Sequence, residues 1–177
     1  MSTLVKNILR FALLILVQFY VLDKIHLHRM VTPYVYYLFI LWMPFKLNRT
    51  IQMLLAFLLG FTLDSFRHSP GFHAAACVLI AYIRPFLINI LIPQEGADSN
   101  YEEPSVRSMG GFFQYMVYAS VLTLIHHAWL FFLEAWEFGD IWYFLLKTLL
   151  STIISVALIF VAEALFSRKQ KFRTNTA

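Results

Sequence analysis

The stretch GFTLDSFRHSPGFHAA, residues 60–75, lies between two strongly apolar runs and carries an acid, a base and two histidines of its own. Each flanking run is long enough to cross a bilayer, whose hydrocarbon core of about 30 Å needs about 20 apolar residues per helix. Ser-Pro-Gly at 69–71 is a typical turn sequence. The stretch is therefore an active site, a binding loop or the turn of a membrane hairpin, and the rest of the sequence decides among these.

The composition indicates a membrane protein. Of the 177 residues, 60% are hydrophobic and 14% are charged, which is far too apolar for a soluble domain of this size. We expect an all-α, polytopic helical bundle that forms a single transmembrane domain over residues 1–177. The apolar run that follows Lys6 and Arg10 resembles a signal peptide, but no small-residue cleavage site follows it, so we interpret it as the first membrane helix.

The apolar runs and the residues that break them predict about six membrane helices. The second would begin with Thr32 as N-cap and Pro33 at the first helical position. A polar, acidic linker at 93–111 separates four helices from two. The six expected helices cover approximately residues 7–23, 32–46, 50–66, 71–92, 111–135 and 140–166.

The distribution of basic residues predicts the orientation in the membrane. Three basic residues, Lys24, Arg29 and Arg67, fall on one set of loops, and nine fall on the other set and the two termini. Because cytoplasmic segments carry the excess of Lys and Arg, we expect both termini and the linker in the cytoplasm and residues 60–75 outside. The nine are Lys6, Arg10, Lys46, Arg49, Arg107, Arg168, Lys169, Lys171 and Arg173.

The net charge of +4 does not indicate a nucleic-acid partner. Four of the basic residues stand together at 168–173, directly after the last apolar run, where a cytoplasmic flank is expected. The lipid bilayer is the expected surrounding.

Arg84 is the charge expected deepest in the membrane, where an unpaired charge costs about 2.5–3.5 kcal/mol. Pro85 would free the carbonyl of Ala81, so Arg84 could brace a kink there, reach the interface, or bind a ligand. Glu163 is its expected charged partner.

Several polar residues of the outer half could converge on one cavity: Asp64, His73, His126, His127, Glu134 and Lys147. Alternatively, Lys147 and Glu134 reach the interface separately. The adjacent pair His126 and His127 points in directions about 100° apart, which is a poor metal motif. Without a nucleophile elbow or a suitable acid pair, we expect no catalytic residues, no metal and no cofactor. The aromatic run at 34–37 is typical of an interfacial belt, or else of a groove for a partner.

The helix end Leu58-Leu-Gly60-Phe-Thr-Leu-Asp64, the turn Ser69-Pro-Gly71 and the helix start His73-Ala-Ala resemble MreD, the rod shape-determining membrane protein of bacteria. The family motif covers Gly60, Asp64, Pro70, Gly71 and His73. Pro70 directly precedes Gly71, where the common family spelling has a residue between them. Elsewhere the resemblance is one of hydropathy.

The resemblance implies a non-enzymatic inner-membrane scaffold of the elongation complex. Such a protein binds the bitopic protein MreC and works with the MreB filament, RodA and its partner transpeptidase in lateral peptidoglycan synthesis and cell-shape control. The family is also similar to the substrate-binding membrane subunits of energy-coupling-factor transporters. In such a subunit, an outer pocket around Asp64, His73 and His126 would hold a small, vitamin-like molecule.

The motif residues also have expected physical roles. Gly60 would let its helix approach a neighbour closely, and Ser69 would cap the next helix. Asp64 lies at a helix C-terminus, where negative charge is unfavourable, so it needs His73, Arg67 or the start of the next helix as compensation. We expect a salt-linked hairpin, the alternative being that Asp64 lies in interfacial water.

Overall fold

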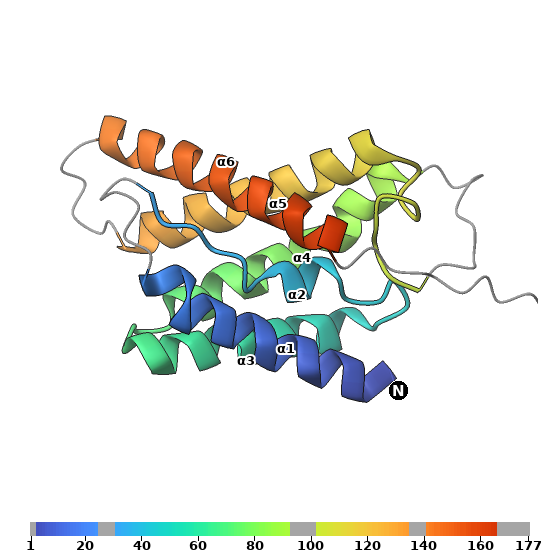
Figure 1. Cartoon of the computed structure of the whole chain (residues 1–177), viewed down its shortest axis with the longest axis horizontal. Helices are drawn as coiled ribbons and strands as arrows, with labels where there is room; N and C mark the ends of the chain where they lie inside the picture. Colours follow the sequence, from blue (N-terminus) through green and yellow to red (C-terminus); the bar gives the residue numbers. More distant parts are fainter. Residues whose placement is uncertain (1–2, 25–30, 93–101, 135–140, 166–177) are drawn as a thin grey trace, which may run out of the picture.

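The computed structural model describes residues 3–24, 31–92, 102–134 and 141–165, and within these ranges it is all-helical (Figure 1). Five of its helices are long and one is very short. In chain order, the elements are α1 (Thr3–Tyr20), the 3-10 turn η1 (Leu22–Lys24), α2 (Leu38–Leu41), α3 (Arg49–Arg67), α4 (Phe72–Leu91), α5 (Phe112–Glu134) and α6 (Ile141–Leu165).

Four segments are long and apolar enough to cross a membrane, namely Val5–Lys24 and the helices α4, α5 and α6. This supports a multi-pass membrane protein. The fifth long helix, α3, lies outside that set because it carries Arg49, Gln52, Asp64 and Arg67 within 19 residues.

The long helices run alongside one another between two ends of the bundle (Figure 1). The hairpin end holds the α3–α4 turn, η1, the end of α5 and the start of α6. The linker end holds the start of α1, the turn at 44–48, residues 102–111 and the end of α6. Helix α4 packs between α3 and α5, and α5 packs between α4 and α6.

The predicted second helix is wrong. Residues 32–35 are not helical, and only Leu38–Leu41 forms a helix, with Tyr37 rather than Thr32 at its N-cap position. We call residues 31–48 the crossing segment, because they still run from the hairpin end to the linker end (Figure 1). Residues 34–43 of this segment are buried.

Side chains from distant helices satisfy the backbone of the crossing segment. Ser151 Oγ accepts from Thr32 N, and Ser155 Oγ accepts from Tyr34 N, both at 3.0 Å. The Gln18 amide makes two of its three hydrogen bonds to this backbone, accepting from Val35 N at 2.9 Å and donating to the Pro33 carbonyl at 3.2 Å. Pro33 has no N–H to satisfy. An extended backbone is tolerated at membrane depth only where protein groups replace the missing water, as they do here.

The described part of the predicted linker belongs to the bundle. Glu103 is 3% exposed and pairs with Arg10 at 2.9 Å and with Lys6 at 3.4 Å, so it ties residues 102–111 to α1. Phe45 N donates to the Glu102 carbonyl at 3.0 Å, which links the same residues to the crossing segment. The remainder of the linker, 93–101, lies outside the described residues.

Replacing Gln18 with Leu tests this arrangement. The change leaves Val35 N–H and the Pro33 carbonyl without their partner, and each such buried group costs about 1–3 kcal/mol. We expect Gln18→Leu to lower the free energy of unfolding by about 2–4 kcal/mol, measured by denaturant titration in detergent. Gln114→Leu, at a half-buried position on α5, is the control. Equal stability of the two variants would contradict the arrangement.

Candidate functional site

The tyrosine–histidine cluster, made of Tyr34, Tyr36, His73, Cys77 and His126, lies buried near the hairpin end. Tyr36 is at its centre, with its hydroxyl 2.9 Å from His73 Nδ1 and 2.8 Å from His126 Nε2. The Cys77 thiol donates to the same hydroxyl at 3.7 Å. All five residues are at most 1% exposed. The crossing segment, α4 and α5 thus share one polar contact.

Arg67 forms the border of this cluster toward the hairpin end. Its guanidinium donates to both carboxylate oxygens of Asp23, at 2.7 and 2.8 Å. Nη1 also donates to Tyr34 Oη at 2.8 Å and lies 3.1 Å from His73 Nε2. Asp23 accepts a further bond from Gln18 at 2.8 Å. The charge pair therefore connects η1, the crossing segment, α3 and α4.

The contacts of Arg67 fix the direction of the hydrogen bonds in the cluster. A guanidinium only donates, so His73 Nε2 must accept, and the proton of neutral His73 is on Nδ1. His73 Nδ1–H then donates to Tyr36, whose hydroxyl donates to His126 Nε2. His126 must carry its proton on Nδ1, which has no partner in the described part of the chain. The chain of donors thus runs from Arg67 inward to His126.

The neighbouring His127 serves a different set of partners. Its Nδ1 donates to the Thr123 carbonyl at 2.8 Å, and its Nε2 lies 3.2 Å from Ser155 Oγ. The Tyr37 ring stacks on His126 with centroids 4.3 Å apart, and its hydroxyl donates to Thr123 Oγ1. The two adjacent histidines therefore act separately. Within the described residues, no group of three His, Cys, Asp or Glu side chains is placed to hold a metal ion.

Asp64 caps the first turn of α4 from the neighbouring helix. Its carboxylate accepts from the backbone N–H groups of His73 at 3.1 Å and Ala74 at 2.8 Å, and from Ser69 Oγ at 2.5 Å. Gly71, at the N-cap position, has no side chain to do this. Of the three expected compensations for Asp64, the structure shows the helix start, because the Arg67 and His73 side chains bind elsewhere.

Three expectations for the hairpin are therefore wrong: the Ser69 cap, the salt link and its alternative, Asp64 in interfacial water. Ser69 orients Asp64 by donating to it and does not cap α4 itself. Asp64 is 2% exposed, so it does not lie in interfacial water, and the hairpin is held by a carboxylate on backbone N–H groups rather than by a salt link.

Two glycines of the hairpin have the roles that the sequence predicts. A Cβ on Gly60 would lie 2.6 Å from the Ala74 nitrogen, so only glycine allows this close approach of α3 and α4. Gly71 adopts φ 94°, a conformation that follows Pro70 and turns the chain into α4.

Arg84 anchors the other half of the crossing segment. It is 1% exposed and donates to Tyr118 Oη at 2.9 Å, to Gln52 Oε1 at 2.9 Å and to the Met43 carbonyl. Tyr118 in turn donates to the Leu41 carbonyl at 3.0 Å. Arg84 therefore satisfies the Met43 carbonyl just after α2 and orients Tyr118 toward the Leu41 carbonyl, and it does not bind the Ala81 carbonyl that Pro85 frees.

The charged partner expected for Arg84 and the surroundings expected for Lys147 also differ in the structure. Glu163 accepts from Trp42 Nε1 at 3.1 Å and from Tyr115 Oη at 3.2 Å, so it and Arg84 have different partners. Lys147 pairs with Glu134 at 3.3 Å, apart from the cluster. The convergence of all outer polar residues on one cavity is therefore wrong, and so is the alternative that Lys147 and Glu134 reach the interface separately.

Sequence reasoning missed the central residues of the cluster. Tyr34, Tyr36 and Tyr37 are at most 1% exposed, so the run at 34–37 is not an interfacial belt. Pro33 and the three closely spaced tyrosines after it could have indicated this burial. They fit poorly in the interior of a membrane helix, and the tyrosine hydroxyls need partners.

Comparison with protein-family models, with curated proteins and with solved structures finds no match to this chain. The functional proposal below therefore rests on the geometry of the site and on the resemblance of the hairpin motif.

Asp64 can be tested by two substitutions. Asp64→Ala removes all three accepted hydrogen bonds and leaves two buried N–H groups at the start of α4, so we expect a loss of about 2–4 kcal/mol in the free energy of unfolding. Asp64→Asn keeps one acceptor oxygen and should lower the free energy of unfolding by less. Ser65→Ala, at an exposed position one residue along α3, is the control. A stability of Asp64→Ala within about 0.5 kcal/mol of the wild type would rule out the cap.

The direction of the donor chain is testable by ¹⁵N NMR of histidine-labelled protein at neutral pH. We expect both His73 and His126 as neutral rings that are protonated on Nδ1. In Tyr36→Phe, which keeps the ring and removes the hydroxyl, the signals of these two residues should shift, whereas Tyr20→Phe, exposed on α1, should change neither. A proton on Nε2 of His126 in the wild type would refute the assigned direction.

Proposed function

We propose that this protein is a non-enzymatic scaffold of the bacterial inner membrane, of the MreD kind, that recruits wall-synthesis proteins through its helix faces. Three residues of the motif support a structural role, because each of them positions another element of the chain. Asp64 caps α4, His73 holds Tyr36, and Gly60 sets the spacing of α3 and α4.

The observation that carries the proposal is a groove along the α3–α4 hairpin. It has a volume of about 850 Å³, and its apolar lining is Phe57 and Phe61 on α3 and Ala74, Ala75 and Val78 on α4. Toward the turn it is lined by Asp64, Ser65, His68, Ser69, Pro70 and Gly71. The two phenylalanines are 44% and 52% exposed and stack on each other at 5.7 Å. Small residues beside exposed aromatic rings let a partner helix approach closely in a bilayer.

The expected partner is the single membrane helix of an MreC-like bitopic protein. Asp64 and Gly60 make the groove rigid, so a partner helix can bind without ordering the hairpin first. The resemblance implies that the MreB filament, RodA and its partner transpeptidase then join through this complex. The chain itself contributes no catalysis in this proposal.

The orientation follows from the charges at the two ends of the bundle. Five described basic residues are at the linker end, Lys6, Arg10, Lys46, Arg49 and Arg107, whereas Lys24 and Arg67 are at the hairpin end. We therefore place the linker end in the cytoplasm and the groove in the outer half of the membrane. The remaining basic residues of the loops and termini lie outside the described ranges.

The alternative, a vitamin-binding transporter subunit, needs an outer pocket that contains Asp64, His73 and His126. Asp64 borders the α3–α4 groove, but both imidazoles bind Tyr36, and neither is among the residues that line this groove. The site geometry thus favours the scaffold.

A leucine in the groove tests the proposal. Ala75 is exposed, so Ala75→Leu leaves the fold intact and obstructs a close-packed helix. We expect about tenfold less of the MreC protein of the same genome to co-purify, which corresponds to about 1.4 kcal/mol. Ala157→Leu, an exposed alanine on α6, should leave co-purification unchanged.

Cell shape provides the second measurement. Depletion in the native host should give rounded cells, and Ala75→Leu should fail to restore the rod shape where Ala157→Leu restores it. Normal rods after deletion, together with loss of vitamin uptake, would replace the scaffold by the transporter subunit.

A further inference from the structure

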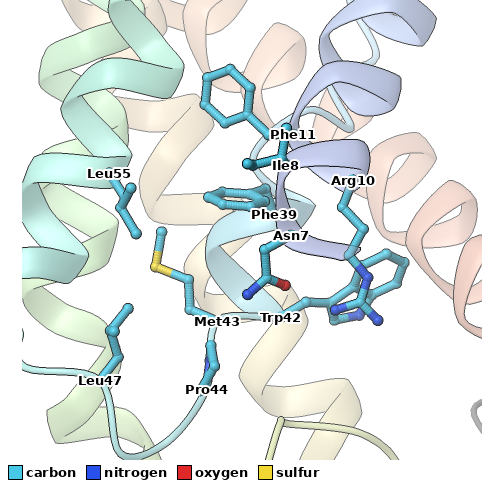
Figure 2. Close-up of a pocket in the computed structure, with 10 residues that line it drawn as sticks. All are labelled: Asn7, Ile8, Arg10, Phe11, Phe39, Trp42, Met43, Pro44, Leu47 and Leu55. Atoms are coloured by element: carbon cyan, nitrogen blue, oxygen red, sulfur yellow. The ribbon is translucent and has the colours of Figure 1, made fainter. Parts of the chain in front are cut away.

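A second cavity lies at the linker end of the bundle, between α1 and α3 (Figure 2). It has a volume of about 410 Å³. Ile8 and Phe11 of α1 form one wall, Leu47 and Leu55 form the other, and Phe39 and Met43 of the crossing segment lie between them (Figure 2). The hairpin motif and the proposed partner groove have no part in it.

The cavity exists because α1 and α3 separate toward the linker end. Near the hairpin end, Phe19 and Phe66 join the two helices with ring centroids 5.2 Å apart. Toward the linker end, the short α2 and the turn after it occupy the space between them in place of a full helix. Ile8 is 61% exposed, so this wall borders the surrounding membrane.

One end of this apolar cavity is polar and basic. Arg10 and Asn7 line it, and Lys6, 45% exposed, lies on the same face of α1. Both cations pair with the single carboxylate of Glu103, so Lys6, Arg10 and Glu103 together carry one positive charge, and Glu163 is held by Trp42 Nε1. Arg10 meets both Glu103 oxygens through Nη1 alone and lies over the Trp42 ring at 5.5 Å.

Donor groups remain for a ligand at this end. In the described part of the chain, Arg10 Nε and Nη2 and the Asn7 amide have no hydrogen-bond partner. A guanidinium with free N–H groups binds phosphate oxygens strongly, and an amide donates to the same kind of acceptor. The Arg10 guanidinium and the Asn7 amide can therefore bind an anion at this end of the apolar cavity.

We propose that this cavity binds one anionic phospholipid, with an acyl chain between α1 and α3 and the headgroup at Lys6, Asn7 and Arg10. An α-helix with side chains is about 10–12 Å across, which is too wide for a chamber of this volume, whereas a single alkyl chain fits. The site requires only that these helices lie in a bilayer, and it is independent of the partner proposed above.

The test uses the full chain reconstituted in phosphatidylcholine vesicles that contain a small fraction of a lipid with a photoactivatable acyl chain. The probe is phosphatidylglycerol in one sample and phosphatidylcholine in the other, and labelled peptides are mapped by mass spectrometry. We expect labelling at Phe11, Met43 and Leu55 to be about tenfold stronger with the glycerol lipid, the ratio given by one charge-assisted contact.

Two matched variants separate the cavity from the general lipid surface. Ile8→Trp places a large ring at the exposed wall and should reduce labelling of the cavity residues about tenfold. Leu9→Trp, 58% exposed on the neighbouring face of α1, should leave it unchanged. Equal labelling by the two lipids in the wild-type protein, or unchanged labelling in Ile8→Trp, would overturn the proposal.

Discussion

The backbone N–H and C=O groups of residues 32–35 need hydrogen-bond partners from other helices, and the rest of the structure depends on this requirement. A stretch that is not helical cannot satisfy its own N–H and C=O groups, and a bilayer offers no water to replace them. Ser151, Ser155 and Gln18 supply the missing partners, so α6 and α1 are tied together through the segment that lies between them. Pro33 reduces the requirement by one donor. Gln18 of α1 and Ser151 and Ser155 of α6, which are polar residues in otherwise apolar helices, have this role.

The other buried polar residues follow from the same requirement. At the hairpin end, the tyrosines of the crossing segment bring hydroxyls into the bundle, and His73, His126 and Thr123 bind them. At the linker end, Arg84 and Tyr118 satisfy the carbonyls of Met43 and Leu41. Burying polar groups is costly unless they are hydrogen-bonded, and here side chains of the helices bind the polar groups of the crossing segment. Such a network favours one arrangement of the helices over its competitors and gives the proposed scaffold a fixed outer face.

The α3–α4 hairpin could be predicted from local sequence because its determinants are local. Pro70 and Gly71 act within the turn, Gly60 acts on Ala74 of the next helix, and the apolar runs define α4, α5 and α6. The crossing segment could not be predicted, since an apolar, aromatic run after a proline fits a helix equally well. Its extended form depends on Ser151 and Ser155, which are 119 and 121 residues distant from their partners in the chain. The partners of Arg84 could not be predicted either, because they come from α3, α5 and the crossing segment. For Asp64, the sequence did not distinguish among His73, Arg67 and the start of the next helix as partners.

The backbone conformation of the crossing segment tests the central claim most directly. Solid-state NMR of the protein in lipid bilayers, with ¹³C and ¹⁵N labels on threonine, tyrosine, valine and leucine, reports this conformation residue by residue. We expect extended Cα and Cβ shifts at Thr32, Tyr34 and Val35, followed by helical shifts over Leu38–Leu41. Continuous helical shifts from Thr32 to Met43 would contradict it, because a helix would leave Gln18, Ser151 and Ser155 without the backbone groups that they bind.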